Sequence, residues 1–201
     1  MTAERETYLV ELVDPTGARR GSATVDEAHR APGRLHRAFS VFLRDASGRV
    51  LLQQRAAVKT RFPLLWANTC CGHPLPGEAL AVAARRRLGE ELRISVSALA
   101  PVGIHTYRAE DPATGRVEHE YDHVLIGDLP AGAVLDPDPA EVADLRWVTV
   151  PELLTAVRDD PSTYAPWLAG VAKCLPRVPR PNAGPEFGRE PDDVPERSGG
   201  R

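Results

Sequence analysis

Residues 66–74 (WANTCCGHP) carry side chains that can move protons or bind metals. In an extended chain, side chains alternate between two faces, so Cys71 and His73 share one face and Cys70 lies on the other. A histidine or a cation beside a thiol lowers its pKa and makes it a usable proton carrier or nucleophile. We therefore expect the thiol of Cys71 to be more acidic than a free thiol. The alternative is a small buried cysteine pair, which fits Cys70 better than Cys71.

A second group of candidate residues lies at 116–123 (RVEHEYDH), a segment that reads as a strand. Glu118 and Glu120 then share one face, while the alternate side chains point to the other. Two carboxylates at this spacing suit a cation site or an acid–base pair, although a pattern of this kind is more often an exposed polar face. His29 and His36 stand seven residues apart across a Pro-Gly loop, and nothing local explains two histidines there.

A third group lies near the end of a predicted helix over residues 78–92. Arg86 and Arg87 precede Glu90 and Glu91 by one turn, so Arg87 and Glu91 are i,i+4 neighbours. A solvated, salt-bridged helix face would explain this pattern. However, the helix follows a loop with a glycine at each end, over residues 72–77, and such a loop can place carboxylates beside backbone oxygens, as a hard cation requires.

These side chains must be positioned by a mixture of strands and helices. In the helix over 78–92, Leu80, Ala84, Leu88 and Leu92 recur every fourth residue and predict one buried face. The order of elements predicts a mixed sheet with helices packed on it. We expect a strand ending in a turn over 8–17, a loop over 29–36, a hairpin of 38–43 with 50–54, an irregular stretch over 55–76, a hairpin of 102–108 with 117–126, a strand over 145–148, a helix opened by Pro151 and a final helix over 164–174.

Composition excludes several classes of protein. The chain has 201 residues, of which 42% are hydrophobic and 26% charged, as expected for one globular domain with a sizeable core. A net charge of −3 offers no broad basic field for nucleic acid or an anionic membrane. No apolar run is long enough to span a membrane, we expect no secretory leader from the first residues, and three cysteines make a poor disulfide framework. We therefore expect a cytoplasmic protein with reduced thiols.

The last part of the chain differs in composition from the rest. Residues 175–201 hold six prolines and four glycines among scattered charges, with few apolar side chains. Such a segment cannot bury enough surface to offset the entropy lost on ordering. We predict a disordered tail there, following a folded domain over residues 1–174.

Taken together, these segments resemble the type I isopentenyl-diphosphate Δ-isomerases of the Nudix superfamily. The resemblance covers roughly residues 8–174. The Nudix superfamily has a sequence box, G-x5-E-x7-R-E-U-x-E-E-x-G-U, in which U is an aliphatic residue. Two residues of this chain depart from it: Arg87 stands where the box has the glutamate that follows its arginine, and Arg93 stands where the box has its second glycine. The matching text is His29, RLHRAFS (34–40), RAAVK (55–59), FP (62–63), WANTCCGHP (66–74), GE (77–78), RR (86–87), EEL (90–92), YRA (107–109), EHE (118–120) and APWL (165–168).

The resemblance implies an α/β (α+β) fold, with a Nudix-like mixed β-sheet sandwiched between helices in a single domain. It also implies an isomerase that interconverts isopentenyl diphosphate and dimethylallyl diphosphate by protonation and deprotonation, in the biosynthesis of isoprenoid precursors. The small-molecule diphosphate would be the only partner, with no nucleic acid and no membrane, and the protein would be a monomer or a weak homodimer.

Site residues carry over from the family one by one. His29, His36, His73, Glu118 and Glu120 match the ligands of one metal site, for which Mn²⁺, Mg²⁺ and Zn²⁺ are all chemically possible. Glu91 matches a ligand of a Mg²⁺ ion that bridges to the diphosphate. Arg55, Lys59 and Arg87 match cationic contacts to the diphosphate. Cys71 and Glu120 match the two proton-transfer groups, on opposite faces of the substrate, while Tyr107 matches a hydrogen-bonding partner of Glu120 and Trp167 an aromatic ring over the hydrocarbon end.

One departure concerns the diphosphate. Many family members have a lysine four residues before the first histidine, and that lysine contacts the diphosphate, whereas this chain has Val25. Two other functions compete with the isomerase. A Nudix hydrolase of a nucleoside diphosphate derivative would release phosphate or a nucleoside monophosphate, and a silent binding module would hold metal or diphosphate without turnover. Arg87 within the box disfavours the hydrolase, and the nearly complete site disfavours the binding module.

Overall fold

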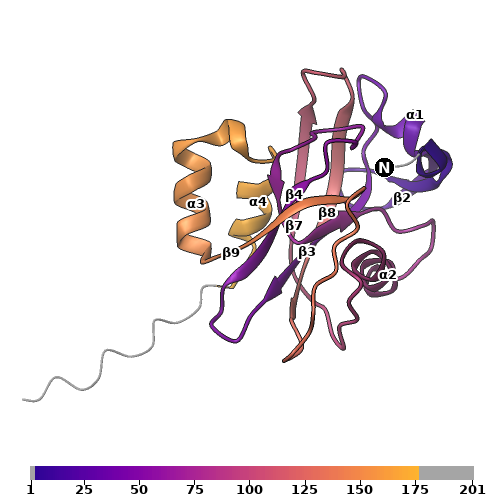
Figure 1. Cartoon of the computed structure of the whole chain (residues 1–201). Coiled ribbons are helices and arrows are strands. Elements are labelled where there is room, and N and C mark those ends of the chain that lie inside the picture. The colour runs from indigo at the N-terminus through magenta and orange to yellow at the C-terminus, as the bar shows by residue number, and fades with distance from the viewer. Residues whose placement is uncertain (1–2, 177–201) are drawn as a thin grey trace, which may run out of the picture.

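The computed structural model describes residues 3–176, which form one nine-stranded mixed sheet between two layers of helices (Figure 1). Helices α3 (Val150–Asp159) and α4 (Leu168–Lys173) cover one face, and α2 (Leu80–Leu92) covers the other. A hydrophobic cluster fills each interface. This arrangement confirms the predicted α+β fold of a mixed sheet sandwiched between helices.

Strand β3 (His36–Arg44) lies at the centre of the sheet. Residues 38–43 are all buried because helices cover both faces, which explains their nearly continuous apolar sequence. On one edge β3 pairs in parallel with β8 (Val117–Asp128), from His36↔Glu120 to Arg44↔Asp128. On the other edge it pairs antiparallel with β6 (Cys70–Gly72). The register therefore brings together His36, the segment that carries Cys71, and the strand that carries Glu118 and Glu120.

The predicted hairpin of 38–43 with 50–54 is only partly correct. Both strands and the turn exist, and the Asp45 carboxylate accepts hydrogen bonds from two backbone amides of the turn. However, β3 and β4 (Val50–Arg55) pair only at Arg44↔Val50 and then diverge. They diverge because the edges of β3 are taken by β6 and β8, while β4 pairs with β9 (Val142–Val148) and β5 (Trp66–Ala67).

The second predicted hairpin is confirmed. Strands β7 (Ala100–Glu110) and β8 pair antiparallel along nearly their whole length, with Tyr107 opposite Glu120. Asp111 closes the turn, because its carboxylate accepts from the Ala113 amide and its own amide donates to the Arg116 carbonyl. The same carboxylate also accepts from the amide of Phe62, so the turn helps to fix the loop that follows β4.

Helix α2 confirms its predicted buried face and its predicted end, but it begins at a different residue. Ala84, Leu88 and Leu92 of α2 are fully buried. The helix begins two residues later than predicted because Glu78 belongs to the preceding loop, where its carboxylate accepts a hydrogen bond from the Leu75 amide. The final helix, predicted over 164–174, is shorter. Pro166 disfavours helical backbone at the residue before it, so the chain stays non-helical through residues 164–166.

The N-terminal part contains elements that the sequence did not predict. They are the short 3₁₀ helix η1 (Ala3–Thr7), strand β2 (Arg19–Thr24) beside β1 (Leu9–Val13), and helix α1 (Val25–His29). A capping box of Thr24 and Glu27 starts α1, so His29 ends a helix rather than opening the predicted loop.

At the C-terminus, Leu175 falls within the predicted tail but is buried in the cluster under α3 and α4. Residues 177–201, which make up nearly all of that predicted tail, lie outside the described residues. Among the helices of residues 3–176, none combines the length and apolar character that crossing a bilayer requires.

Candidate active site

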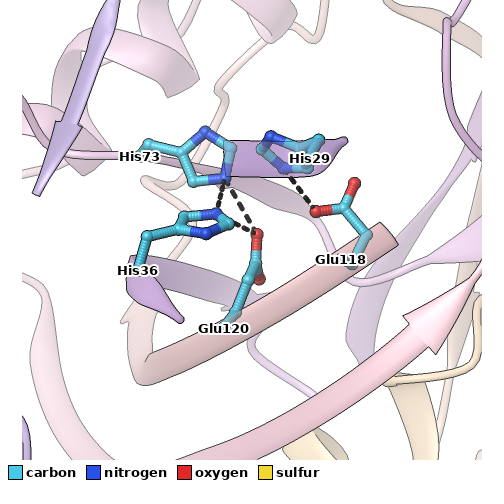
Figure 2. Close-up of side chains that lie close together, drawn as sticks. All are labelled: His29, His36, His73, Glu118 and Glu120. Atoms are coloured by element: carbon cyan, nitrogen blue, oxygen red, sulfur yellow. Dashed lines mark hydrogen bonds and ion pairs between the residues drawn. The ribbon is translucent and has the colours of Figure 1, made fainter. Parts of the chain in front are cut away.

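Five side chains from distant parts of the chain converge at one end of the sheet (Figure 2). They come from α1, β3, the loop after β6, and β8. One potential ligand atom from each lies within 4.8 Å of all the others. The five residues are His29, His36, His73, Glu118 and Glu120, which are the metal ligands implied by the family resemblance.

The separations within this cluster fit ligands around a common ion. His73 Nε2 lies 2.8 Å from Glu120 Oε1 and 3.2 Å from His36 Nε2, and His29 Nε2 lies 2.8 Å from Glu118 Oε2. Ligand atoms bound at about 2.1 Å to one octahedral ion lie roughly 3 Å apart. Imidazole nitrogens and carboxylate oxygens are both common ligands of divalent metal ions. The residues present therefore fit a divalent cation.

The outer nitrogens of two histidines are held by backbone carbonyls. His29 Nδ1 lies 2.7 Å from the Val25 carbonyl oxygen, and His36 Nδ1 lies 2.8 Å from that of Arg34. A carbonyl can only accept, so both Nδ1 atoms donate, and each Nε2 points to the other members of the cluster. Metal-binding histidines are commonly oriented in this way.

Burial and neighbouring charges set the protonation of the cluster. Burial lowers the pKa of His73 to about 4, so this imidazole is neutral, the form that binds metals. Burial alone would raise the pKa of Glu118, but His29 and Arg61 hold it well below its ordinary value. Burial and Glu118 also act to raise the pKa of Glu120, yet the neighbouring imidazoles of His36 and His73 bring it down to about 2. Both carboxylates are thus ionised at neutral pH.

Arg61 is a member of this site that the sequence analysis missed. Its Nε donates to Glu118 Oε1 over 2.9 Å, on the carboxylate oxygen that does not face His29. The guanidinium is buried and also forms an ion pair with Glu6. Arg61 therefore fixes the orientation of a potential metal ligand. Its partner lies 57 residues away, so no local pattern could have revealed it.

The metal cluster opens into a cavity of about 690 Å³. Most of the residues implied by the family resemblance lie on its wall. Three of them do not line the cavity. His29 and His36 are buried within the cluster of potential metal ligands, and Glu91 is buried in an ion pair with Arg87. The predicted residues that line the cavity are Val25, Arg55, Lys59, Cys71, His73, Arg87, Tyr107, Glu118, Glu120 and Trp167.

Cys71 faces the cavity, whereas Cys70 is fully buried in the cluster under α2. Strand β6 places them on opposite faces, as the alternation of side chains predicts. Burial raises the pKa of Cys71 to about 12, with Arg55 acting in the opposite direction. The expectation that Cys71 is more acidic than a free thiol is therefore wrong. The sequence indicated its cationic neighbours but not that the surrounding residues shield its thiol from water.

Aromatic rings close the cavity on the side of α4. The Tyr107 hydroxyl donates to Glu120 Oε2 over 2.7 Å, and its ring stacks on Trp167 with centroids 5.8 Å apart. Phe62 packs edge-on against Trp167, whose Nε1 donates to the Asn68 side chain over 3.1 Å. These contacts hold the indole in one orientation, with its ring at the cavity wall.

One end of the cavity is strongly charged. Lys59 and Arg87, predicted to contact a diphosphate, both form ion pairs with the buried carboxylate of Glu141. Arg87 also pairs with Glu91, so this arginine is buried and is not part of a solvated helix face. Glu141, which the sequence analysis missed, thus gathers the cations of this end. Its partners are 82 and 54 residues distant in the sequence.

Comparison with known proteins identifies the family. The family model described as NUDIX domain matches residues 34–169. The isopentenyl-diphosphate Delta-isomerase of Nocardia farcinica is 59% identical over 175 residues, covering 87% of this chain and 98% of its own length. The isopentenyl-diphosphate Delta-isomerase of Streptomyces coelicolor is 50% identical over 166 residues, covering 83% and 82%. This chain belongs to the isopentenyl-diphosphate Delta-isomerase family, within the NUDIX superfamily.

Solved structures show that this chain has the NUDIX fold. The crystal structure of DR0079 from Deinococcus radiodurans matches with a TM-score of 0.66 at 20% identity, covering 82% of this chain and 97% of its own. The MutT NUDIX hydrolase from Burkholderia pseudomallei matches with a TM-score of 0.53 at 18% identity, covering 71% and 98%. At this level of identity the likeness concerns the fold alone.

Binding of a divalent metal should stabilise the protein. A ligand that binds only the folded state at a hundred times its Kd adds about 2.7 kcal/mol, which corresponds to a rise in Tm of roughly 5–10 °C. We expect Mn²⁺ to produce such a rise in a thermal unfolding experiment, and His36→Ala to abolish it. His119→Ala is the matched control, because His119 lies on the other face of β8 and contacts Gly33. An equal rise in the His36→Ala protein would place the ion elsewhere.

Glu141→Gln should destabilise the fold. Breaking a buried ion pair on one side leaves uncompensated charge and costs about 3 kcal/mol or more. Burial alone would raise the pKa of Glu141, but Lys59 and Arg87 hold it below its ordinary value of 4.5. The stabilisation is therefore fully present above pH 4.5 and is lost as the pH falls through the lowered folded-state pKa. Urea unfolding at pH 7 measures the difference between the two proteins.

Asp128→Asn serves as the control for Glu141→Gln. Asp128 pairs with Arg44 at the surface, where an ion pair contributes at most about 1 kcal/mol. If Glu141→Gln costs no more than Asp128→Asn, then Glu141 does not organise the buried cations.

Proposed function

We propose that this chain interconverts isopentenyl diphosphate and dimethylallyl diphosphate by adding a proton to one carbon and removing one from another. The observation that carries the proposal is that proton-transfer groups and buried cations line one and the same cavity. One part holds the Cys71 thiol and the Glu120 carboxylate, and another holds a set of buried cations. The names of the relatives support the same reaction.

The cationic end would bind the diphosphate. Lys59 and Arg87 are already held in place by Glu141, so they lose little entropy when they bind an anion. Arg55 is fixed by two backbone carbonyls, those of Arg61 and Phe62, and donates toward Cys71 over 3.8 Å. Binding energy from the unreactive diphosphate would then orient the hydrocarbon end against the proton-transfer groups.

Cys71 and Glu120 would be the two proton-transfer groups. They come from strands on opposite edges of β3, and both reach the cavity. A substrate lying between them could receive a proton from one group while the other removes a proton from a different carbon. Tyr107 donates to Glu120 Oε2, so it holds that carboxylate in position and limits its freedom to rotate.

Trp167 would stabilise the intermediate. Protonation of the alkene gives a tertiary carbocation, which must be stabilised without an attacking nucleophile. The face of a desolvated indole offers about 2 kcal/mol or more to a cation. Arg55 already lies over this ring, with its central carbon 5.5 Å from the centroid, and so marks the ring as a site for positive charge.

Metals would complete the site. The cluster of three histidines with Glu118 and Glu120 would hold Mn²⁺, Mg²⁺ or Zn²⁺, and a bound cation would alter the proton affinity of the adjoining carboxylate. We also propose that Glu91 contributes to a Mg²⁺ site at the diphosphate. Glu91 is buried and contacts both Arg87 and the Gln53 amide.

Product analysis tests the proposed function. The purified protein is incubated with isopentenyl diphosphate, Mg²⁺ and Mn²⁺, and the mixture is assayed for dimethylallyl diphosphate and for released phosphate or pyrophosphate. We expect the isomer with no release of either anion. Release of phosphate or pyrophosphate would replace the isomerase with a hydrolase, and an unchanged substrate that still binds would indicate a binding module.

A further inference from the structure

The cavity contains a cation that no motif and no family resemblance assigned. Arg5 of η1 lies on the cavity wall together with Val25, the first residue of α1. Helix η1 packs on α1, and the Val25 amide donates to the Tyr8 carbonyl just beyond η1. The N-terminal residues therefore place a guanidinium close to a position where this chain has only an apolar side chain.

Arg5 belongs to the same charge cluster as the predicted diphosphate contacts. Its Nη1 lies 2.9 Å from Glu141 Oε1, and its Nη2 lies 3.1 Å from Glu90 Oε2. Arg87 pairs with the same two carboxylates, at 3.3 Å from Glu141 and 2.7 Å from Glu90. Two shared carboxylates thus hold Arg5 beside Arg87 and aim both guanidinium groups at one end of the cavity.

Accessibility separates Arg5 from its neighbours. Its side chain is 23% exposed, whereas those of Arg87 and Lys59 are 8% and 4% exposed. Charge also favours a role for Arg5. The carboxylates of Glu90, Glu91 and Glu141 already engage Lys59, Arg86 and Arg87, and Arg86 is shared with Glu78. A further cation is therefore needed to give this end of the cavity positive charge toward an anionic ligand. Arg5 is therefore more open than Lys59 and Arg87, and it adds the positive charge that this end of the cavity needs.

The residue after Arg5 anchors it. Glu6 forms an ion pair with Arg61 at 3.0 Å and accepts a hydrogen bond from the Thr60 hydroxyl over 3.0 Å. Thr60 and Arg61 directly follow Lys59, so η1 is fastened to the segment that carries a predicted diphosphate contact. A guanidinium on an anchored turn is pre-organised for bidentate recognition of a phosphate group.

We propose that Arg5 is a further cationic ligand of the substrate diphosphate, supplied by the N-terminal turn at the end of the cavity where Val25 offers no charge. The assignment deepens the proposed function and rests on it for the identity of the ligand. Because the diphosphate is remote from the reacting carbons, Arg5 should contribute to substrate binding far more than to the proton transfers.

Arg5→Ala tests the assignment in two assays. We expect the KM for isopentenyl diphosphate to rise about tenfold or more, the effect of losing one charge-assisted hydrogen bond, with kcat changed less than about threefold. Calorimetric titration with inorganic pyrophosphate and Mg²⁺ should show a similar loss of affinity. Arg20→Ala is the control, since Arg20 pairs with Asp14 at the surface and lies outside the cavity. It should leave both measurements unchanged.

Two further variants separate binding from a structural role. Arg5→Lys keeps the charge and should retain most of the affinity for pyrophosphate. Adding Val25→Lys to Arg5→Ala returns a cation to the same end of the cavity and should restore affinity in part, which mere repair of the fold would not do. Unchanged KM and pyrophosphate affinity in Arg5→Ala would overturn the proposal. So would a loss of Tm or kcat with pyrophosphate affinity intact, since that would make Arg5 a structural residue.

The two proposals fail in different ways. If the wild-type protein does not isomerise the substrate, the proposed function is wrong. Pyrophosphate titration of the wild-type and Arg5→Ala proteins would then still decide whether Arg5 binds a diphosphate group.

Discussion

Replacing Cys71 with alanine is expected to lower kcat by about 10³-fold or more, because a group that transfers a proton to or from the reacting carbon is lost. The fold should survive, since Cys71 is only partly buried and its side chain is small. Steady-state kinetics with isopentenyl diphosphate measure the loss, and circular dichroism with a thermal unfolding curve checks the fold. The KM should change far less than kcat, because Lys59 and Arg87 remain in place.

Cys70→Ala is the matched control for Cys71→Ala. It removes the same atoms one residue away, from a thiol that points into the cluster under α2. We expect nearly normal kcat with a modest loss of stability from the small cavity that is left. Substantial activity in the Cys71→Ala protein would remove the thiol from the mechanism. An equally large loss in both proteins would show that the effect is structural or that the wrong thiol has been assigned.

Glu120→Gln is the second change with a large expected effect. The amide has nearly the shape of the carboxylate and can still accept a hydrogen bond from Tyr107. However, a side-chain amide cannot take up or deliver a proton at neutral pH. We expect kcat to fall by about 10³-fold or more. Activity is measured over a range of Mn²⁺ and Mg²⁺ concentrations, with bound metal determined by elemental analysis.

Two comparisons show whether Glu120 acts on the proton or only on the metal. Glu118→Gln alters the same metal cluster without touching the partner of Tyr107, so high metal concentrations should restore part of its activity. Glu120→Gln should remain inactive even when its metal content is normal. Glu110→Gln, at an exposed position of the same hairpin, should be fully active. Recovery of Glu120→Gln at high metal would contradict a role in proton transfer.

The family resemblance named most of the residues that line the cavity, and local periodicity by itself predicted how some of them are oriented. Alternation along one strand placed Glu118 and Glu120 on the same face, and alternation in another separated Cys71 from Cys70. The four-residue repeat of apolar side chains predicted the buried face of α2. These features depend on backbone geometry over a few residues, so the sequence alone is sufficient to predict them.

The parts that could not be predicted depend on contacts between distant segments. Arg61 meets Glu118, and Glu141 meets Lys59 and Arg87, only because the sheet brings separate loops together. Nothing in the residues around Glu141 distinguishes it from an exposed glutamate. The predicted direction of the Cys71 pKa is wrong for a related reason. The sequence shows the residues next to Cys71, but the shielding of its thiol arises from the packing of β6 against β3 and the surrounding loops.

Proton NMR of the reaction in D₂O tests the central claim most directly, because it follows both proton transfers at once. The protein is incubated with isopentenyl diphosphate, Mg²⁺ and Mn²⁺, and the carbon-bound protons are followed over time. We predict the appearance of dimethylallyl diphosphate with deuterium at the carbon that is protonated, and deuterium also entering the remaining isopentenyl diphosphate as the reaction reverses. An unchanged spectrum with the metals bound, or cleavage of the diphosphate without deuterium on carbon, would contradict the isomerase.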